Sequence, residues 1–427
     1  MNQENEIEVL GFWWVLGHSE DRFTGILKYS KEKGAILQIL CDKEHKEFRN
    51  NYKRYDIIYG VADNKVFTLY HCTKTGFSFS GLNYYSFESE YLFVHNSNYL
   101  ENAQDVVFNR IDVRMSNTNN FFRGFQIFNV KEEHGETNDT GKYTIDYNLK
   151  QIGFNINDNL TGKKRTGYNH NEQFSEKTFS IEGKIWFCIE SNDESLVSIH
   201  LLLDKMNDLR MFFSIVVQGI TVYDEVVGKR FDFEQDMKIY LSDNFDEAFA
   251  SRRFTIFDYF KVNEKLPSIL ERWFYLTQEI PEVINLFYHT YTSTQFYEYH
   301  FRDTYVAVEG LFQWKKNCDT EKKNVISILL NDVLKSEEKR NNIPTFVKIV
   351  DGFPAWSEVA RNNRHFHTHL NKNKYADKIV DNKELLKLMR KMQAIILFYL
   401  LEELGLSDSE IESAFRKLEL HFLPFFF

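Results

Sequence analysis

Glycine and proline divide the chain into two parts with different backbone requirements. Sixteen of the 19 glycines precede residue 245, whereas all five prolines follow it. Glycine suits the tight turns that join short strands, and proline is accepted in the first turn of a helix but not in the middle of a sheet. The distribution therefore predicts a strand-rich first part and a helical second part, divided between residues 243 and 244.

The first part consists of short runs rich in β-branched and aromatic residues, separated by turn dipeptides such as Asp63-Asn64. Polar and apolar residues alternate clearly over Phe179–Ile185, as in a strand with one buried face. Many strands at this spacing, without intervening helices, are typical of an antiparallel sandwich or barrel. The predicted strands include Gly25–Tyr29, Ala35–Leu40, Tyr55–Tyr59, Thr178–Cys188 and Leu196–Leu203.

In the second part, apolar residues recur with the period of an α-helix. The predicted helices include one that ends before Pro281, then Phe301–Trp314, Val325–Leu334 and a long one over Lys383–Leu404. Gly405 is expected to terminate the long helix, and Ser407 with Glu410 forms a capping box for a last helix. We expect a bundle of five or six helices. The predicted fold class is α+β and multidomain: an antiparallel β-sandwich or barrel-like domain over residues 1–243, then an all-α bundle over residues 244–427.

The charge distribution bears on nucleic-acid binding. The net charge is −10, and the whole excess of acidic side chains lies in the first 264 residues, which hold 30 basic and 40 acidic side chains. The remaining residues hold 22 of each kind. A neutral helical part can carry a local basic cleft, although its overall charge would not bind a nucleic acid tightly.

We expect a cytoplasmic protein with no contact to a membrane. The chain contains no run of about 18 apolar residues. Its polar, acidic N-terminus lacks the basic and apolar regions of a signal peptide. The four cysteines are widely spaced and form no CxxC pair, as expected for free thiols in a reducing compartment.

Residues 361–370 are the most chemically distinctive segment. They hold two arginines, two asparagines and three histidines. Imidazoles exchange protons near neutral pH, and guanidinium groups hold phosphate in a planar fork. A solvated polar turn between helices is the simplest alternative. A zinc site formed by the three histidines is a weaker one, because no carboxylate or cysteine stands at ligand spacing. We therefore expect no metal and no cofactor.

Two pairs of residues in this segment could cut a phosphodiester bond. Arg364 and His369 are separated by four residues, and Arg361 and His367 by five, with Asn362 directly after the first arginine. In either pair the histidine would move a proton to or from the ribose 2′-hydroxyl or the leaving 5′-oxygen. The arginine would stabilise the charge that grows on phosphorus. The residues by themselves leave both pairs open.

The segment resembles the HEPN ribonuclease motif, an Arg-x4-6-His pattern near the end of a helical bundle. In the Apea-like branch the motif usually has asparagine after the arginine, an aromatic third residue and a Thr-His ending. Arg364–His369 has this spacing, aromatic residue and ending, but His365 stands in the place of the asparagine. The resemblance favours Arg364/His369 and does not exclude Arg361-Asn362/His367. Asp303–Phe312 is similar to a second conserved helix of this family. The similarity implies that Glu309 orients a motif arginine or histidine, where helical periodicity alone indicates a solvent-facing glutamate.

The resemblance also covers Gly11–Val15 and Gly25–Tyr29, which are similar to the β-rich domain of these proteins. It implies a metal-independent endoribonuclease of bacterial anti-phage defence. The strand-rich domain would sense or restrain, and the helical domain would cut cellular RNA, with tRNA as one candidate, to 2′,3′-cyclic phosphate ends. It further implies a homodimer through the helical domain, a phage-derived trigger and abortive infection.

Two other functions are compatible with the sequence. The helical domain could be a non-catalytic, dimerising module that binds RNA or a protein. Alternatively, the strand-rich domain could bind a carbohydrate or a phage protein as the main activity. An aromatic platform built from Trp13, Trp14, Tyr84 and Tyr85 would favour that second alternative, whereas their burial in a core is the simpler interpretation.

Overall fold

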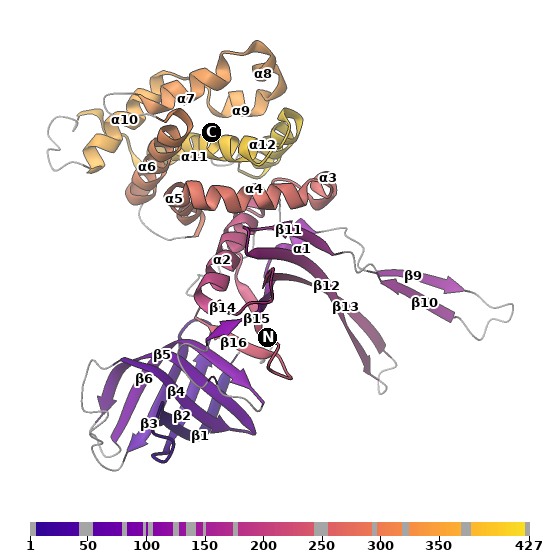
Figure 1. Ribbon diagram of the computed structural model, residues 1–427. Helices are drawn as coiled ribbons and strands as arrows, with labels where there is room; N and C mark the ends of the chain where they lie inside the picture. The colour runs from indigo at the N-terminus through magenta and orange to yellow at the C-terminus, as the bar shows by residue number, and fades with distance from the viewer. Residues whose placement is uncertain are drawn as a thin grey trace. The chain divides into compact units, whose positions relative to one another are not determined.

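The computed structural model divides the chain into two compact units (Figure 1). The strand unit comprises Met1–Ser116, Gln126–Asn207 and Val222–Asp246, and the helical unit comprises Asn117–Phe125, Asp208–Thr221 and Glu247–Phe427. The predicted domain boundary between residues 243 and 244 lies at the edge of a segment outside the described residues and stays a prediction. The structure describes residues 6–41, 54–78, 83–96, 100, 106–122, 128–133, 142–147, 151–173, 178–242, 255–292, 297–317, 324–368 and 377–422.

Six antiparallel strands of the strand unit close into a barrel. Their order is β6-β3-β2-β1-β4-β5, and pairing between β5 and β6 completes the ring. Side chains such as Trp13, Leu37 and Phe87 fill its core. This barrel, followed by a helical unit, confirms the predicted fold class. The strands are β1 (Ile7–Val15), β2 (Phe23–Ser30), β3 (Gly34–Cys41), β4 (Arg54–Ala62), β5 (Lys65–Ser78) and β6 (Asn83–His95).

The barrel sheet continues into a second set of strands. The first half of β6 pairs with β3, and Tyr91–Val94 in its second half pairs with β16. From β16 the sheet continues through β15, β8, β13 and β12 to β11. These strands are β16 (Met237–Leu241), β15 (Tyr223–Lys229), β8 (Arg110–Met115), β13 (Thr178–Ser191), β12 (Leu160–Gln173) and β11 (Ile152–Asn155). Two small sheets pair β7 (Val107–Phe108) with β14 (Val197–Ser198), and β9 (Phe128–Glu133) with β10 (Lys142–Tyr147).

The predicted strand Leu196–Leu203 is wrong. Only β14 is extended there, and an 18-residue helix, α2 (Ile199–Val216), begins directly after it. Within α2, Leu202, Met206 and Leu209 are fully buried, and their spacing is that of one helix face. A short apolar run cannot be assigned to strand or helix by periodicity alone, and the run of leucines was too short to reveal this face.

Gly60 on β4 lies directly against the indole ring of Trp13. A Cβ at this position would lie 2.1 Å from a ring carbon of Trp13. The ring is fully buried, and its Nε1 donates a hydrogen bond of 2.9 Å to the Gly25 carbonyl. We therefore expect Gly60→Ala to lower the free energy of unfolding by about 1–3 kcal/mol in urea denaturation. Gly153→Ala on β11, where a Cβ meets no atom within 4 Å, is the control. An equal loss in both variants would contradict the proposed clash.

The described residues of the helical unit contain ten helices from α3 to α12, so the predicted count of five or six is wrong. The predicted long helices are present, and the additional ones include the short α3, α8 and α9, which span too few residues to show a periodic pattern. The helices are α3 (Tyr259–Val262), α4 (Leu266–Glu279), α5 (Pro281–Thr292), α6 (Tyr297–Lys316), α7 (Val325–Leu334), α8 (Glu337–Asn342), α9 (Pro344–Ile349), α10 (Ala355–Thr368), α11 (Asn382–Glu403) and α12 (Asp408–Phe422). A further short helix, α1 (Thr118–Phe121), also belongs to this unit.

Helix α6 lies between α5, α10 and α11 and contributes an apolar face to the core of the helical unit (Figure 1). Phe301, Tyr305, Val308 and Leu311 are all buried. The predicted end of α11 is confirmed, because Gly405 adopts a φ of +81°. The capping box of α12 is confirmed as well: the Ser407 amide donates to Glu410 Oε2 at 2.7 Å, and the Glu410 amide donates to Ser407 Oγ at 3.4 Å. No helix among the described residues combines the length and the apolar composition needed to cross a bilayer.

Candidate active site

The arginine- and histidine-rich segment is helical as far as it is described. Residues 361–368 form the second half of α10, so a polar turn is the wrong interpretation for them. His369, the histidine of the favoured pair, lies outside the described residues. The described part of α10 carries Arg361, Asn362, Arg364 and His367.

One face of α10 packs against α6. Arg364 Nη2 lies 3.1 Å from Glu309 Oε2, and each of these side chains is about one-fifth exposed, at 22% and 21%. One turn further along α10, the ring of His367 lies edge-on to that of Phe301, with ring centroids 6.3 Å apart. Glu309 therefore faces a motif arginine, as the family resemblance implies, and is not a solvent-facing glutamate.

Tyr305 lies beneath Arg364. It is 2% exposed, and the guanidinium carbon of Arg364 lies 5.9 Å from its ring centroid. Burial raises the pKa of Tyr305, and the Glu309 carboxylate adds to this, whereas Arg364 and Arg361 oppose it. The phenol therefore stays neutral at physiological pH and offers its ring face to the guanidinium group.

Arg361 occupies a more exposed position one turn earlier on α10. Its Nη2 lies 2.7 Å from Glu358 Oε1 within the same helix, and the two side chains are 36% and 51% exposed. Asn362 is half-buried. An α-helix turns by about 100° per residue, so Arg364 and His367 lie about 60° apart around α10, and Arg361 and His367 about 120°. Within one chain, the described geometry thus groups Arg364, His367 and Glu309.

Asn363 is a structural residue that the sequence analysis did not single out. It is fully buried, and its side-chain amide donates to the Val359 carbonyl at 2.9 Å and to the Lys378 carbonyl at 3.3 Å. Its Oδ1 accepts a hydrogen bond of 3.2 Å from the Val380 amide. Asn363 thereby fixes the chain that leads into α11 against the arginine-bearing half of α10. The sequence signal that could have identified Asn363 is its position three residues after Ala360, on the buried face of the helix.

We expect Asn363→Ala to lower the free energy of unfolding by about 1–3 kcal/mol, because it leaves buried backbone groups without their partner. The neighbouring Asn362→Ala removes the same atoms from a half-buried position. It should change the free energy of unfolding by less than about 0.5 kcal/mol. The free energy of unfolding of both variants is measured by urea denaturation. An equal loss in the two variants would contradict the structural role of Asn363.

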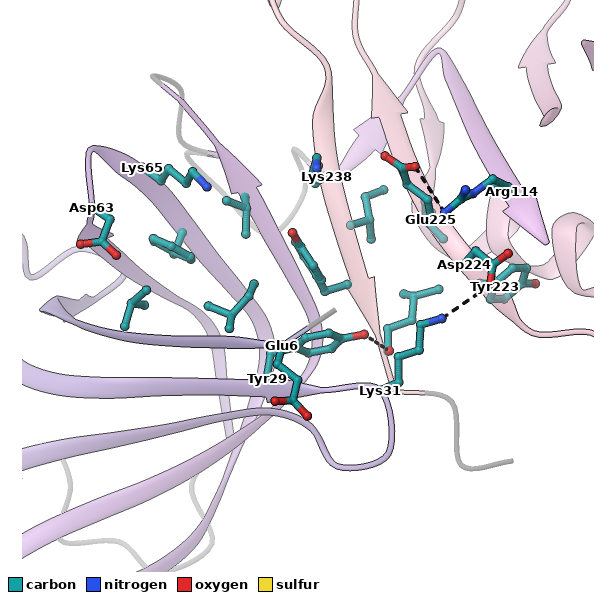
Figure 2. A pocket seen from close by; sticks show the side chains of 18 residues that line it. Glu6, Tyr29, Lys31, Asp63, Lys65, Arg114, Tyr223, Asp224, Glu225 and Lys238 are labelled. Carbon is teal, nitrogen blue, oxygen red and sulfur yellow. Dashed lines mark hydrogen bonds and ion pairs between the residues drawn. The ribbon is translucent and has the colours of Figure 1, made fainter. Parts of the chain in front are cut away.

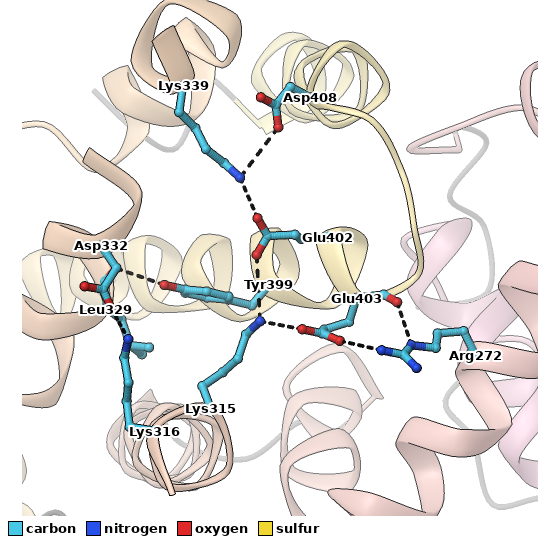
Figure 3. A network of polar contacts seen from close by, with 10 residues as sticks. All are labelled: Arg272, Lys315, Lys316, Leu329, Asp332, Lys339, Tyr399, Glu402, Glu403 and Asp408. Carbon is cyan, nitrogen blue, oxygen red and sulfur yellow. Dashed lines mark hydrogen bonds and ion pairs between the residues drawn. The ribbon is translucent and has the colours of Figure 1, made fainter. Parts of the chain in front are cut away.

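A second group of charged residues in the helical unit is an ion-pair network and offers no free cation for a phosphate (Figure 3). Lys339 Nζ lies 2.5 Å from Glu402 Oε1, and Arg272 lies 3.1 Å from Glu403. Lys315 is bound by Glu403. Burial lowers the pKa of Lys339, but the contacts with Glu402 and Asp408 outweigh it, so the net shift is upward. These cations are neutralised by carboxylates and join α4, α6, α8, α11 and α12.

The strand unit shows a mixed-charge pocket and no platform built from the proposed aromatic residues. Trp13, Trp14 and Tyr85 are buried, which supports their place in the core. The pocket, of about 340 Å³, lies between the barrel strands and β15 and β16 (Figure 2). Four basic and four acidic side chains line it; Lys31 lies 3.8 Å from Asp224, and Arg114 lies 4.0 Å from Glu225. This balance gives the pocket no preference for a ligand of one charge.

Two family models match the chain. The model described as ApeA N-terminal domain 1 matches residues 8–273, which is more than half of the chain. The model described as Apea-like HEPN matches residues 288–410 and so includes Glu309 and all the arginines and histidines of residues 361–370. No curated protein and no solved structure is significantly similar to the chain. The two matches confirm the resemblance that the sequence motifs indicate.

Proposed function

Because the chain belongs to the ApeA-type HEPN proteins, a family of anti-phage defence, we propose that it is a metal-independent endoribonuclease. The observation that carries the proposal is the placement of Arg364. Its guanidinium group is held between Glu309 and the ring of Tyr305, on the same face of α10 as His367. A fixed arginine beside a histidine is what phosphoryl transfer without a metal requires.

The proposed reaction uses the RNA itself as nucleophile. A histidine accepts the proton of the ribose 2′-hydroxyl, and the 2′-oxygen attacks the adjacent phosphorus. The bond from phosphorus to the 5′-oxygen breaks, and the leaving oxygen takes up a proton from a second acid. The products are a 2′,3′-cyclic phosphate and a 5′-hydroxyl, and no water is consumed. Arg364 stabilises the negative charge on the phosphorane oxygens.

One donor of Arg364 supports this role. Its Nε is buried and makes no hydrogen bond within the described part of the chain. A buried donor without an acceptor is costly and calls for an explanation. In the proposed complex, a phosphate oxygen supplies the acceptor after a small movement of the arginine. His367 and His369 are the proton-transfer candidates, and Asn362 and Arg361 would contact the RNA at the edge of the site.

The biological setting is proposed from the family. The protein would act as a homodimer through the helical unit, so that residues of two chains converge on one RNA. A phage-derived trigger would act through the strand unit, and cleavage of cellular RNA, with tRNA as one candidate, would end growth of the infected cell. We propose the cytoplasm as the compartment, since both the RNA and the trigger are found there.

Mapping RNA 5′-hydroxyl ends in cells that express the wild type or the His369→Ala or His367→Ala variant tests catalysis and identifies the substrate. New 5′-hydroxyl ends in the wild type, lost in at least one variant, are expected. Cleavage by the purified protein should persist in EDTA. If wild type and variants gave the same ends during phage infection, the nuclease proposal would be rejected.

A non-catalytic, dimerising RNA- or protein-binding module is the second candidate. The ion pair between Arg364 and Glu309 favours it, because a neutralised arginine can serve packing alone. In that case the wild type would bind RNA or a protein without producing 5′-hydroxyl ends, and Arg364→Ala would weaken binding or dimerisation instead of cleavage.

A further inference from the structure

Three metal-ligating side chains meet in the strand unit, far from the arginine- and histidine-rich segment in sequence. They are His71 on β5, Glu90 on β6 and His200 in the first turn of α2. One ligand atom from each lies within 4.8 Å of the other two. His71 Nδ1 lies 2.8 Å from Glu90 Oε2, and His200 Nδ1 lies 3.7 Å from Glu90 Oε1. All three side chains are partly exposed, so an ion in solution can reach them.

The backbone at His71 is unusual for a strand. Strands β5 and β6 pair Tyr70 with Tyr91 and Cys72 with Ser89, so His71 lies opposite Glu90. His71 has a φ of +51°, in the left-handed region that non-glycine residues seldom occupy. Its ring stacks on that of Tyr70 at 3.8 Å, although neighbouring side chains of a regular strand point to opposite faces. Strain of this kind is concentrated at functional sites.

We propose that His71, Glu90 and His200 bind one divalent transition-metal ion of the zinc type. Zinc prefers imidazole nitrogen and carboxylate oxygen at about 2.0–2.2 Å, which places the ligand atoms of a tetrahedral site roughly 3.3–3.5 Å apart. The two distances of 2.8 and 3.7 Å between the imidazoles and Glu90 lie on either side of that separation. Side-chain rotations that move these atoms by less than about 1 Å would complete the geometry.

The metal would have a definite role in the strand unit. It would join the β5–β6 strand pair of the barrel to the start of α2, and three protein ligands leave a fourth position for water or another ligand. The Tyr91 hydroxyl lies 3.2 Å from His200 Nδ1, the nitrogen that faces Glu90, so the bond to the metal would replace this contact. The alternative is a simple ion pair between Glu90 and one of the histidines. Such an exposed ion pair would contribute little to stability, and it would not explain why a second histidine lies beside the same carboxylate.

Zinc binding by the full-length protein tests this proposal. After removal of metal with EDTA and dialysis, titration calorimetry with ZnCl2 should show one ion bound per chain. Glu90→Gln, His200→Ala and His71→Asn should each weaken binding at least tenfold, and asparagine tolerates the positive φ at this position. His18→Ala is the matched control, because this exposed histidine of the same unit lies outside the cluster and should leave the affinity unchanged.

Cobalt substitution gives an independent readout. The wild type with Co²⁺ should show the intense visible absorption of a four-coordinate ion, and the three ligand variants should not. Failure of the wild type to bind zinc stoichiometrically, or undiminished binding by all three variants, would overturn the proposal. Neither readout depends on RNA cleavage. The EDTA test of RNA cleavage is repeated on the His200→Ala variant, which should lack this metal. The comparison separates the effect of losing this metal from any metal requirement of catalysis.

Discussion

Arg364→Ala is expected to lower the rate of RNA cleavage by about 10²–10³-fold, the usual loss when one preorganised donor to a transition-state oxyanion is removed. Arg364 is fixed by Glu309 and Tyr305, so its charge is already directed before RNA binds. The measurement is single-turnover cleavage of an RNA identified by end mapping. Single-turnover rates report the chemical step without product release. Arg416→Ala, which removes an arginine that is 66% exposed on α12, should leave the rate unchanged.

The same assay separates the two candidate pairs. Arg361 is more exposed and lies outside the Glu309 contact, so Arg361→Ala should lower the rate less than about tenfold. If Arg361→Ala and His367→Ala abolished cleavage while Arg364→Ala and His369→Ala did not, the favoured pair would be wrong and the alternative pair would be the catalytic one. Full activity in all four variants would reject the whole site.

Glu309→Ala is expected to lower the cleavage rate by about 10–100-fold, because loss of the carboxylate frees Arg364 to leave the catalytic geometry. The loss should appear in the chemical step, with little change in RNA affinity. Glu309→Gln keeps an oxygen that can accept the hydrogen bond from Arg364 at 3.1 Å, so it should restore part of the rate. We therefore propose Glu309 as a positioning residue, and rescue by glutamine would distinguish this role from a general loss of folding.

Glu358→Ala is the matched control for Glu309→Ala. It removes the Glu358 carboxylate, which lies 2.7 Å from Arg361 in the region where α10 packs against α6. It should change the rate less than about threefold, because exposed ion pairs contribute little. A larger loss in Glu358→Ala than in Glu309→Ala would contradict the assignment of Glu309 and shift the catalytic role to Arg361.

Local patterns predicted most of the regular elements, because the faces of these helices and strands are buried within their own unit. The helical periodicity of the apolar residues in α7 gave its bounds, Val325–Leu334, without error. The turn at Asp63-Asn64 has two positive φ values, as its residue types indicate, and joins β4 to β5. The pattern failed at α2, where a run of leucines fits both a strand and a helix, and at helices too short to show a period.

The candidate active site was predictable in its chemistry but not in its geometry. The motif and the family matches both point to the arginines and histidines of residues 361–370. Which arginine is fixed depends on how α10 packs on α6, and this packing places Glu309 beside Arg364 and not beside Arg361. The role of Asn363, which binds the chain before α11, also depends on a partner 15 residues away at Lys378.

The sequence by itself determined the family, the two-part fold class and the residue types that we propose for RNA cleavage, because these depend on local periodicity and on a short contiguous motif. The tertiary structure decided which side chains share one site. His71, Glu90 and His200 form no motif, since 18 and 109 residues lie between them along the chain. Only the pairing of β5 with β6 and the start of α2 beside them bring the three ligands together. Long-range contacts of this kind are set by burial over the whole unit, which a single segment of sequence does not encode.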